Sequence, residues 1–299
     1  MILNIILLSF SSAIWGFGFI ATRWTFQVFD PFWSNALRFS LAALLSIPFL
    51  LYKKSFWRKK NILKKAMLSS VFLLGTLLFQ TLGLTSTTVA KSGFITTLYS
   101  LFIPLTMMAF TGKKYRGTFW GLIFMALVGM ALMCNLEVKD LNKGDFLTLL
   151  CAISAAFHIM YIGIVASEIP SAIEFNFLQN IFVAIFSVII ALIFKGPVDL
   201  TPLADYHSDA VKGLLFLGVI SSLISFTIQV VAQKKIPAHI AGLIFLMESP
   251  FAALFGYLVL KELLNPLNLL GAFLIIMSVL LVPVFGREVT TLKRAPEEL

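Results

Sequence analysis

The chain has 299 residues, of which 59% are hydrophobic and only 12% are charged, and its mean hydropathy is +0.96. A water-soluble protein carries roughly 25% charged residues, because its surface must face water. The composition therefore excludes an ordinary soluble enzyme or binding domain. It predicts an integral membrane protein with lipid as its main solvent.

Apolar stretches of about 20 residues recur along the chain, and each can cross a hydrocarbon core of roughly 30 Å. A helix satisfies its own backbone hydrogen bonds in lipid, so we expect an all-α polytopic membrane protein. The first stretch lacks the basic start of a secretory signal, and we interpret it as a retained helix. We predict ten transmembrane helices, at residues 2–22, 32–52, 66–84, 90–110, 118–134, 146–166, 174–194, 213–231, 238–260 and 267–285.

The two cysteines, Cys134 and Cys151, both fall inside predicted spans. We interpret them as small apolar packing residues rather than as a disulfide. No Cys/His pair in the sequence has the spacing of metal ligands, and we expect neither a metal nor a cofactor.

Positive charge is distributed unevenly between the two sides of the predicted spans. If the first span leaves the cytoplasm, 15 Lys and Arg residues lie in cytoplasmic segments and 7 on the opposite side, with Arg38 inside a span. This bias predicts a multi-pass protein of the cell (inner) membrane with its N- and C-termini in the cytoplasm. It also explains the net charge of +9 by contact with lipid head groups, so we expect no nucleic-acid partner.

The second half of the chain resembles the first. The offset between matching segments grows from 142 to 150 residues. The matches are "SAIWGFGFI" from Ser12 with "SAAFHIMYI" from Ser154, "LFIPLTMMAF" with "MESPFAALFG" on Pro104 and Pro250, and "WGLIFMALVGMAL" with "LGAFLIIMSVLL" on Gly121 and Gly271.

Each copy contains five predicted spans. Because five is odd, the second copy must start on the opposite side of the membrane. We therefore expect two inverted five-helix repeats, at residues 1–135 and 144–285, followed by a cytoplasmic tail at 286–299. Inverted repeats of this kind are typical of secondary transporters, which bind substrate near the bilayer midplane and alternate its access to the two sides.

Several of these segments also resemble a known family. "AIWGFGFIATRW", the pair Arg38–Phe39, the proline of the fourth span and "SPFAALFGYLVLKELLNPLNLLGAFLIIMSVLL" are similar to the EamA family of the drug/metabolite transporter superfamily. The resemblance covers essentially the whole chain. It implies two inverted five-helix bundles, a central cavity enclosed by the first four helices of each half, and substrates such as amino acids, nucleosides or drug-like cations. The segment "TGKKYRG" departs from the family pattern, since it lacks the acidic residue that Glu262 supplies in the second half.

Three ionisable side chains lie well inside the predicted spans: Arg38, His158 and Glu248. A charge at the bilayer centre costs at least about 2.5–3.5 kcal/mol. We therefore expect each of them to face other protein groups or a water-filled cavity.

Glu248 stands two residues before Pro250, and Pro104 occupies the matching position of the first half. Proline removes a helix hydrogen bond, and paired helix breaks at matching positions indicate a binding site. Glu248 either contacts a cationic substrate group or a proton, or it is a structural acid that pairs with Arg38. The sequence leaves both alternatives open.

Arg38 and His158 have the same two interpretations, as cavity groups or as structural hydrogen-bonding residues. Further aromatic and amide side chains are candidates for the lining of a substrate cavity. These candidates are Trp15, Tyr99, Tyr161 and Gln80, with Gln229 as an additional amide.

The sequence thus predicts a secondary transporter that moves small metabolites, amino acids or related compounds, outward across the cytoplasmic membrane. Its partners would be a small-molecule substrate, the lipid bilayer and, as a candidate coupling ion, the proton. A channel-like or scaffolding protein is the alternative. A membrane-embedded enzyme is disfavoured, because the chain has no HExxH or GxSxG motif and only three histidines. Substrate identity, direction and oligomeric state are left open by the sequence.

Overall fold

The computed structural model describes residues 2–52, 60–87, 89–134 and 141–286. The regular elements in these ranges are helices, and none of the described residues forms a strand. Nine of the described helices or helix runs are long and apolar enough to cross a membrane, and the helix Gly117–Met133 is apolar but shorter. The ten predicted spans all fall on helices, and the fifth, at 118–134, corresponds to this shorter one. The predicted tail after residue 286 lies outside the described ranges.

The helices of the first half follow one another with short connections. They are α1 (Ile2–Thr25), α2 (Pro31–Tyr52), α3 (Lys60–Gly83), α4 (Val89–Thr97), α5 (Tyr99–Thr111) and α6 (Gly117–Met133).

The second half contains two π-helical segments, η3 and η4, inside its longer helix runs. Its elements are α7 (Lys143–Val165), η1 (Ala166–Glu168), α8 (Ala172–Lys195), η2 (Thr201–Ala204), α9 (Asp209–Leu215), η3 (Phe216–Ser225), α10 (Phe226–Gln233), α11 (Ala238–Phe245), α12 (Glu248–Phe255), η4 (Gly256–Leu260) and α13 (Pro266–Phe285).

Local sequence explains where several helices begin and end. Asn142 and Asp145 form a reciprocal capping box at the start of α7, with both side chain–backbone distances at 3.0 Å. Asn265 and Asn268 do the same for α13. Gly112 ends α5 with a positive φ of 67°, a conformation that costs glycine little. These caps satisfy backbone groups that a helix end leaves free.

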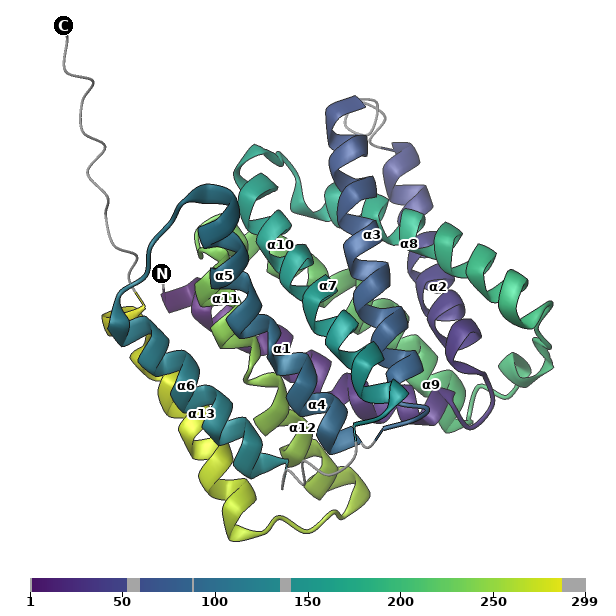
Figure 1. Cartoon of the computed structure of the whole chain (residues 1–299). Helices are drawn as coiled ribbons and strands as arrows, with labels where there is room; N and C mark the ends of the chain where they lie inside the picture. Colours follow the sequence, from purple (N-terminus) through teal and green to yellow (C-terminus); the bar gives the residue numbers. More distant parts are fainter. Residues whose placement is uncertain (1, 53–59, 88, 135–140, 287–299) are drawn as a thin grey trace, which may run out of the picture.

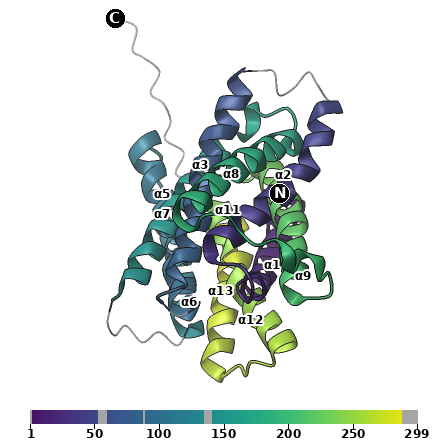
Figure 2. The same cartoon turned by 90° about the vertical axis from the view of Figure 1, so that its right-hand side faces the viewer.

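The helices pack mainly as pairs that join the two halves of the chain. α2 lies along α8, α3 along α7, and α6 along α13 (Figure 1). α1 contacts α9, η3, α10, α11 and α12, and in the turned view it lies between α9 and α12 (Figure 2). The first and second halves are therefore interleaved rather than separate.

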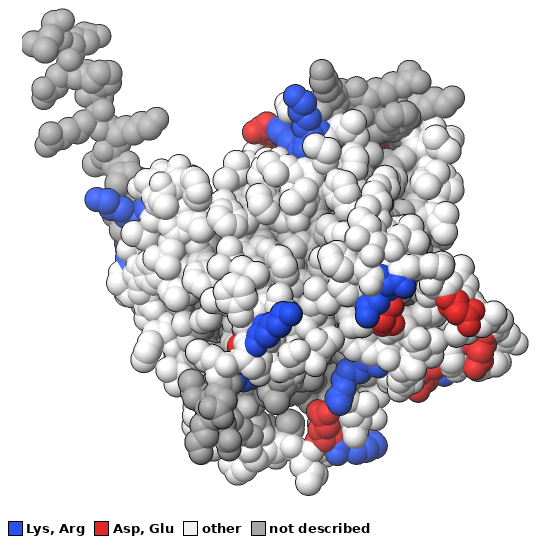
Figure 3. Space-filling view, turned by 45° about the vertical axis from the view of Figure 1, so that its right-hand side comes forward, with Lys and Arg blue, Asp and Glu red and all other residues white. Residues whose placement is uncertain are grey.

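Polar contacts at the helix ends define two opposite faces of the bundle. The face where α1 ends carries Arg23–Glu262, Trp33–Gly196 and Asn268–Met133. The face where α1 begins carries Lys65–Glu168, Lys234–Ile169 and Thr118–Phe285. A wide uncharged band separates the charged side chains of these two faces (Figure 3).

The uncharged band consists of apolar side chains that are exposed in the isolated chain. Examples are Leu44, Phe124, Ile193, Phe273 and Leu280, each at least half exposed. A soluble protein does not expose apolar patches of this extent, whereas a membrane protein covers them with lipid. The chain is a multi-pass membrane protein.

Two helix crossings depend on glycine. A Cβ on Gly129 of α6 would lie 2.7 Å from the Gly271 carbonyl oxygen of α13, and a Cβ on Gly271 would collide with Gly129 in turn. At Gly16 of α1, a Cβ would lie 2.8 Å from both the Glu248 carbonyl oxygen and the Ala252 nitrogen of α12. Small residues let helix backbones approach closely in lipid, and here they bring α1 against the start of α12.

We expect Gly129→Leu to destabilise the protein by about 1–3 kcal/mol, because the new side chain overlaps the backbone of α13. Thermal unfolding of the purified protein in detergent measures the change. Gly121→Leu is the matched control, since it lies on the same helix and a Cβ there meets nothing within 4 Å. Equal melting temperatures for the two variants would contradict the proposed role of this crossing.

Candidate functional site

A central cavity lies between the two halves of the chain, and its empty space, with the part open to solvent included, is about 740 Å³. Helices from both halves line it: α1, α2, α3, α4 and α5 from the first, and α7, η3, α10, α11 and α12 from the second. Its polar lining residues are Trp15, Thr22, Arg38, Thr76, Gln80, Thr96, Tyr99, His158, Ser221, Gln229 and Glu248.

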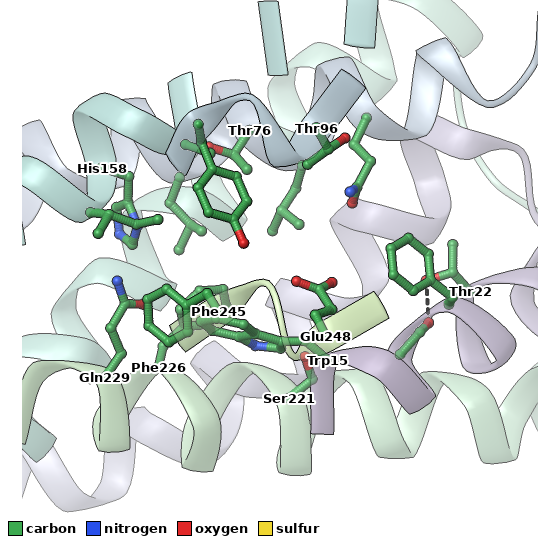
Figure 4. Close-up of a pocket in the computed structure, with 18 of the residues that line it drawn as sticks. Trp15, Thr22, Thr76, Thr96, His158, Ser221, Phe226, Gln229, Phe245 and Glu248 are labelled. Carbon is green, nitrogen blue, oxygen red and sulfur yellow. Dashed lines mark hydrogen bonds between the residues drawn. The ribbon is translucent and has the colours of Figure 1, made fainter. Parts of the chain in front are cut away.

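Three aromatic side chains, Trp15, Phe226 and Phe245, form one wall of the cavity, which we call the aromatic wall. The ring of Trp15 lies 4.9 Å from that of Phe245 and 5.1 Å from that of Phe226, between centroids. His158 meets Phe226 edge to face at 6.0 Å. Figure 4 shows these rings and Gln229 together on one side of the cavity. They form an apolar wall with polar edges.

Glu248 begins α12, immediately after a tight turn at Leu246 and Met247. Pro250 has no N–H to donate to the Leu246 carbonyl, and the Ser249 amide donates to it at 3.2 Å instead. This turn aims the Glu248 carboxylate into the open space below Thr76 and Thr96 (Figure 4). Within the described residues, the carboxylate has no hydrogen-bond or salt-bridge partner.

Arg38 reaches the same cavity from α2, where its side chain is only 6% exposed. Its Nε donates to Ser222 Oγ at 2.9 Å, and its Nη2 donates to Ser221 Oγ at 2.7 Å. Arg38 and Glu248 line the same cavity. They form no ion pair among the described residues, however, so Arg38 is held by neutral hydroxyls.

The two serines lie in η3, whose wider π-helical turns are stabilised by side chains of α8. Asn176 donates to the carbonyl oxygens of Ser222 and Leu223, each at 3.0 Å, and to the Thr227 hydroxyl. Asn180 donates to the Ser222 oxygen at 3.2 Å. π-Helical segments are frequent at functional sites, and here the segment places the hydroxyls that bind the guanidinium.

His158 lines the cavity from α7 and takes part in a second buried network. Its Nε2 lies 3.2 Å from Gln179 Oε1, which also accepts from the Ser69 hydroxyl at 2.5 Å. Gln179 Nε2 donates to Asn176 at 3.4 Å. The network around His158 and the network around Arg38 are thus joined through Gln179 and Asn176 of α8 and through Ser222.

Two lining groups have unused hydrogen-bonding capacity. The indole N–H of Trp15 and the side-chain oxygen of Gln229 are buried and have no partner among the described residues. The amide nitrogen of Gln229 donates to Gln233, which in turn donates to the Ile159 carbonyl oxygen. A buried polar group without a partner costs free energy, so a bound molecule that pairs with either group gains affinity.

A second cavity, of about 1,090 Å³, extends from the first toward the face where α1 ends. We call it the vestibule. It shares Phe19, Thr96, Tyr99 and Glu248 with the central cavity and reaches the ion pair Arg23–Glu262. Glu248 therefore lies at the junction of the two spaces.

The EamA-like transporter family matches twice, at residues 2–135 and 142–283. The chain belongs to the EamA-like transporter family. It is therefore a membrane transporter, and the resemblance stated from the sequence motifs is confirmed.

Two relatives are similar to this chain over most of their length. An uncharacterized transporter from Archaeoglobus fulgidus is 28% identical over 275 residues, which covers 92% of this chain and 84% of the relative. The uncharacterized transporter YoaV from Bacillus subtilis is 23% identical, covering 88% of this chain and 90% of its own. One solved crystal structure matches with a TM-score of 0.73 and covers 93% of this chain and 95% of its own. At 18% identity, that likeness shows the fold alone.

Most of the predicted site residues of this EamA-like transporter line the central cavity: Trp15, Arg38, Gln80, Tyr99, His158 and Glu248. Tyr161, one turn beyond His158 on α7, is not among the residues that line this cavity. Its ring lies 6.0 Å from that of Phe72, between centroids. Neither Pro104 nor Pro250 lines either cavity.

The prolines lie after the helix interruptions rather than at them. α4 ends and α5 begins around Leu98, six residues before Pro104, and α11 ends just before Leu246, four residues before Pro250. The cavity also contains Thr22, Thr76, Thr96 and Ser221, which the sequence did not single out. Hydroxyl residues are common in apolar helices, where they bond the preceding turn as Thr22 and Thr76 do here, so no sequence signal separated them.

We expect Asn176→Leu to destabilise the protein by about 1–3 kcal/mol, because it leaves two buried carbonyls of η3 with fewer donors. Thermal unfolding in detergent measures this effect. Asn61→Leu, an exposed position at the start of α3, is the matched control. If the Asn176→Leu variant has the same melting temperature as the parent protein, Asn176 of α8 does not stabilise the π-helical segment.

Proposed function

We propose that the protein is a secondary transporter that exports small metabolites, amino acids or related compounds, from the cytoplasm by alternating access. The observation that carries this proposal is the position of Glu248. Its carboxylate has no partner among the described residues and lies where a central cavity meets a vestibule that leads to one face. An ionisable group at membrane depth that faces a cavity is characteristic of a transport pathway.

We further propose ten membrane crossings in two inverted repeats, residues 1–135 and 144–285. The double family match, at 2–135 and 142–283, supports two copies. Helix packing supports their symmetry. Exchanging the two halves replaces each helix by its counterpart in the other repeat, and the pairs α2–α8 and α6–α13 then map onto themselves. The contacts of α1 with α9, η3 and α10 map onto those of α7 with α3, and the contacts of α1 with α11 and α12 map onto those of α7 with α4 and α5.

One helix contact in the described part of the chain departs from this symmetry, and the difference supports alternating access. At the face where α1 begins, α11 packs against α5, so closely that a Cβ on Gly242 would collide with Ile103. The repeat maps this pair onto α4 and α12 at the opposite face. There the vestibule lies between the two helices instead. Among the described residues the two ends of the bundle therefore differ, and this difference supports the proposal that the protein has two near-equivalent states.

We propose that the open end faces outward. The excess of Lys and Arg on the other side of the predicted spans supports cytoplasmic N- and C-termini, including the tail at 286–299. The vestibule would then lead to the exterior. A channel fits less well, because the polar residues that the two halves bring to the cavity are unlike and form no ring of like charges among the described residues.

Proteoliposomes loaded with a mixed metabolite pool test the transporter proposal. We expect vesicles that contain the parent protein to lose particular compounds. Glu248→Gln should slow this loss by at least about tenfold, because the substitution removes a buried charge. An imposed pH gradient tests the proton as coupling ion. Transport that does not respond to this gradient would exclude it.

Glu168→Gln is the matched control, since its carboxylate is exposed and pairs with Lys65 away from the cavity. Its transport rate should equal that of the parent. Loss of no compound under any gradient would refute the transporter proposal. A Glu248→Gln protein that unfolds would instead show that Glu248 is structural.

Alternating access also predicts a contact that the present structure lacks. The offset of 146 residues between Pro104 and Pro250 maps Gly242 onto Thr96 and Ile103 onto Ser249. Both Thr96 and Ser249 line the vestibule. We expect Thr96→Cys with Ser249→Cys to form a disulfide during turnover, and the disulfide to stop transport until it is reduced.

The native cysteines must be replaced in this experiment, because Thr96 Oγ1 lies 3.9 Å from Cys151 Sγ. Each single cysteine variant is the control, and its transport rate should be the same with and without oxidant. A double variant that continues to transport, with no crosslinked peptide by mass spectrometry, would contradict this closing motion.

A further inference from the structure

We propose that Asp145 is a positioning residue that holds α4 against α7 and thereby favours the state in which the vestibule is open. The inference rests on the proposed alternating access and names a group that sets the balance between its two states. It is carried by a buried ion pair between α4 and α7, whose matching positions in the other repeats of the two helices carry no charge.

The carboxylate of Asp145 is bound by the chain segment that leads into α4. Lys91 Nζ on α4 lies 2.6 Å from Asp145 Oδ2, and the hydroxyl of Thr87, just before α4, donates to Asp145 Oδ1. The side chain of Asp145 is only 4% exposed and that of Lys91 only 13%. Removing one partner of a buried ion pair is costly, so this pair ties the start of α4 to the start of α7.

Two further polar contacts continue from the ion pair along α7. The hydroxyl oxygens of Ser92 and Thr148 are 3.3 Å apart, and Thr96 Oγ1 lies 3.9 Å from Cys151 Sγ. Asp145, Thr148 and Cys151 are spaced three residues apart, which places them on one face of α7. α4 packs against α7 more than against any other element. Polar contacts thus hold one wall of the vestibule on α7.

The opposite end of the bundle indicates where α4 moves when the vestibule closes. There α11, the counterpart of α4, packs against both α1 and α7, and a Cβ on Gly163 of α7 would lie 2.9 Å from the Cβ of Ala238 of α11. The repeat offsets of 142 and 146 residues map this pair onto Ala21 of α1 and Ser92 of α4. Closure by this symmetry therefore takes Ser92 away from α7 and toward α1, and the contacts between α4 and α7 oppose it.

The repeat symmetry does not extend to the ion pair. The same offsets map Asp145 onto Leu3 and Lys91 onto Pro237, and neither of these residues is ionisable. Two equivalent repeats would give the two states equal free energies, and an interaction made in only one state shifts the equilibrium toward that state. The Lys91–Asp145 pair therefore favours the state with the open vestibule.

Two cysteine reporters measure this balance in full-length protein in detergent, with the native cysteines replaced. Ser249→Cys alone reports the open vestibule, which Ser249 lines, by its rate of labelling with a water-soluble maleimide. Its counterpart Ile103 is fully buried at the opposite end, so we expect closure to protect this cysteine. Thr96→Cys with Ser249→Cys reports the closed vestibule by its rate of disulfide formation under a fixed oxidant.

We expect Asp145→Asn to raise the ratio of the disulfide rate to the labelling rate at least about fivefold, because it removes the charge that binds Lys91. Asparagine is compatible with the capping box of α7. Asn268 occupies the same position in the box of α13, where its side-chain oxygen accepts the Asn265 amide at 2.9 Å.

Lys91→Met should raise the same ratio, and combining it with Asp145→Asn should raise the ratio no further, because both substitutions remove one interaction. Asp209→Asn is the matched control. Asp209 forms an ion pair with Lys212 at the start of α9, and both side chains are half-exposed, so its loss should leave the ratio unchanged.

A ratio that stays at the parent value in Asp145→Asn and Lys91→Met would overturn the inference, and a lower melting temperature with that result would make Asp145 merely structural. If Asp145→Asn does not fold, Lys91→Met decides the matter. These failures are distinguishable from failure of the transporter proposal. A parent protein that transports and forms the disulfide, while its variants keep the parent ratio, would retain alternating access and exclude only the role of Asp145.

Discussion

Two opposite charges inside the membrane-spanning part of the chain, Arg38 and Glu248, set the constraint on which the rest of the site depends. A charge at that depth must be solvated by protein groups or by a cavity. For Arg38 the solvation is built from neutral groups: the hydroxyls of Ser221 and Ser222 on η3. The π-helical geometry of η3 requires support in its turn, which Asn176 and Asn180 provide from α8. A single guanidinium thus explains polar residues on three helices.

Glu248 meets the same constraint at a helix start. The turn at Leu246 and Met247, with Pro250 behind it, redirects the chain and exposes the carboxylate to the cavity. Gly16 allows α1 to pass directly against this turn, because a side chain there would overlap the Glu248 carbonyl. Local backbone chemistry and helix packing together place the acid.

Much of the fold could be predicted from the sequence because each membrane-spanning helix satisfies its own backbone. The apolar runs alone located the helices, and α6, at 17 residues, is the one that falls short of the others. The site could be predicted in part. Glu248, Arg38 and His158 are recognisable in the sequence because ionisable residues are rare in such runs. Tyr161 lies outside the lining of the central cavity, and the sequence does not show this, because aromatic residues are frequent in this chain and the sequence does not fix the rotation of a helix. Thr76 and Thr96 were missed for the same reason, since nothing in a sequence shows which way one hydroxyl points.

The sequence by itself determined the class of protein, the positions of its helices, the repeat and the family, since these depend on composition and on patterns within one segment. Only the tertiary structure decided which side chains share a cavity. Arg38 and the serine that binds its Nε are 184 residues apart, and their meeting depends on the rotation of α2 and the widened turns of η3. That geometry also left Arg38 and Glu248 unpaired with each other. Two charges that could have locked two helices together instead face one space, because the packing of helices from both halves holds them apart.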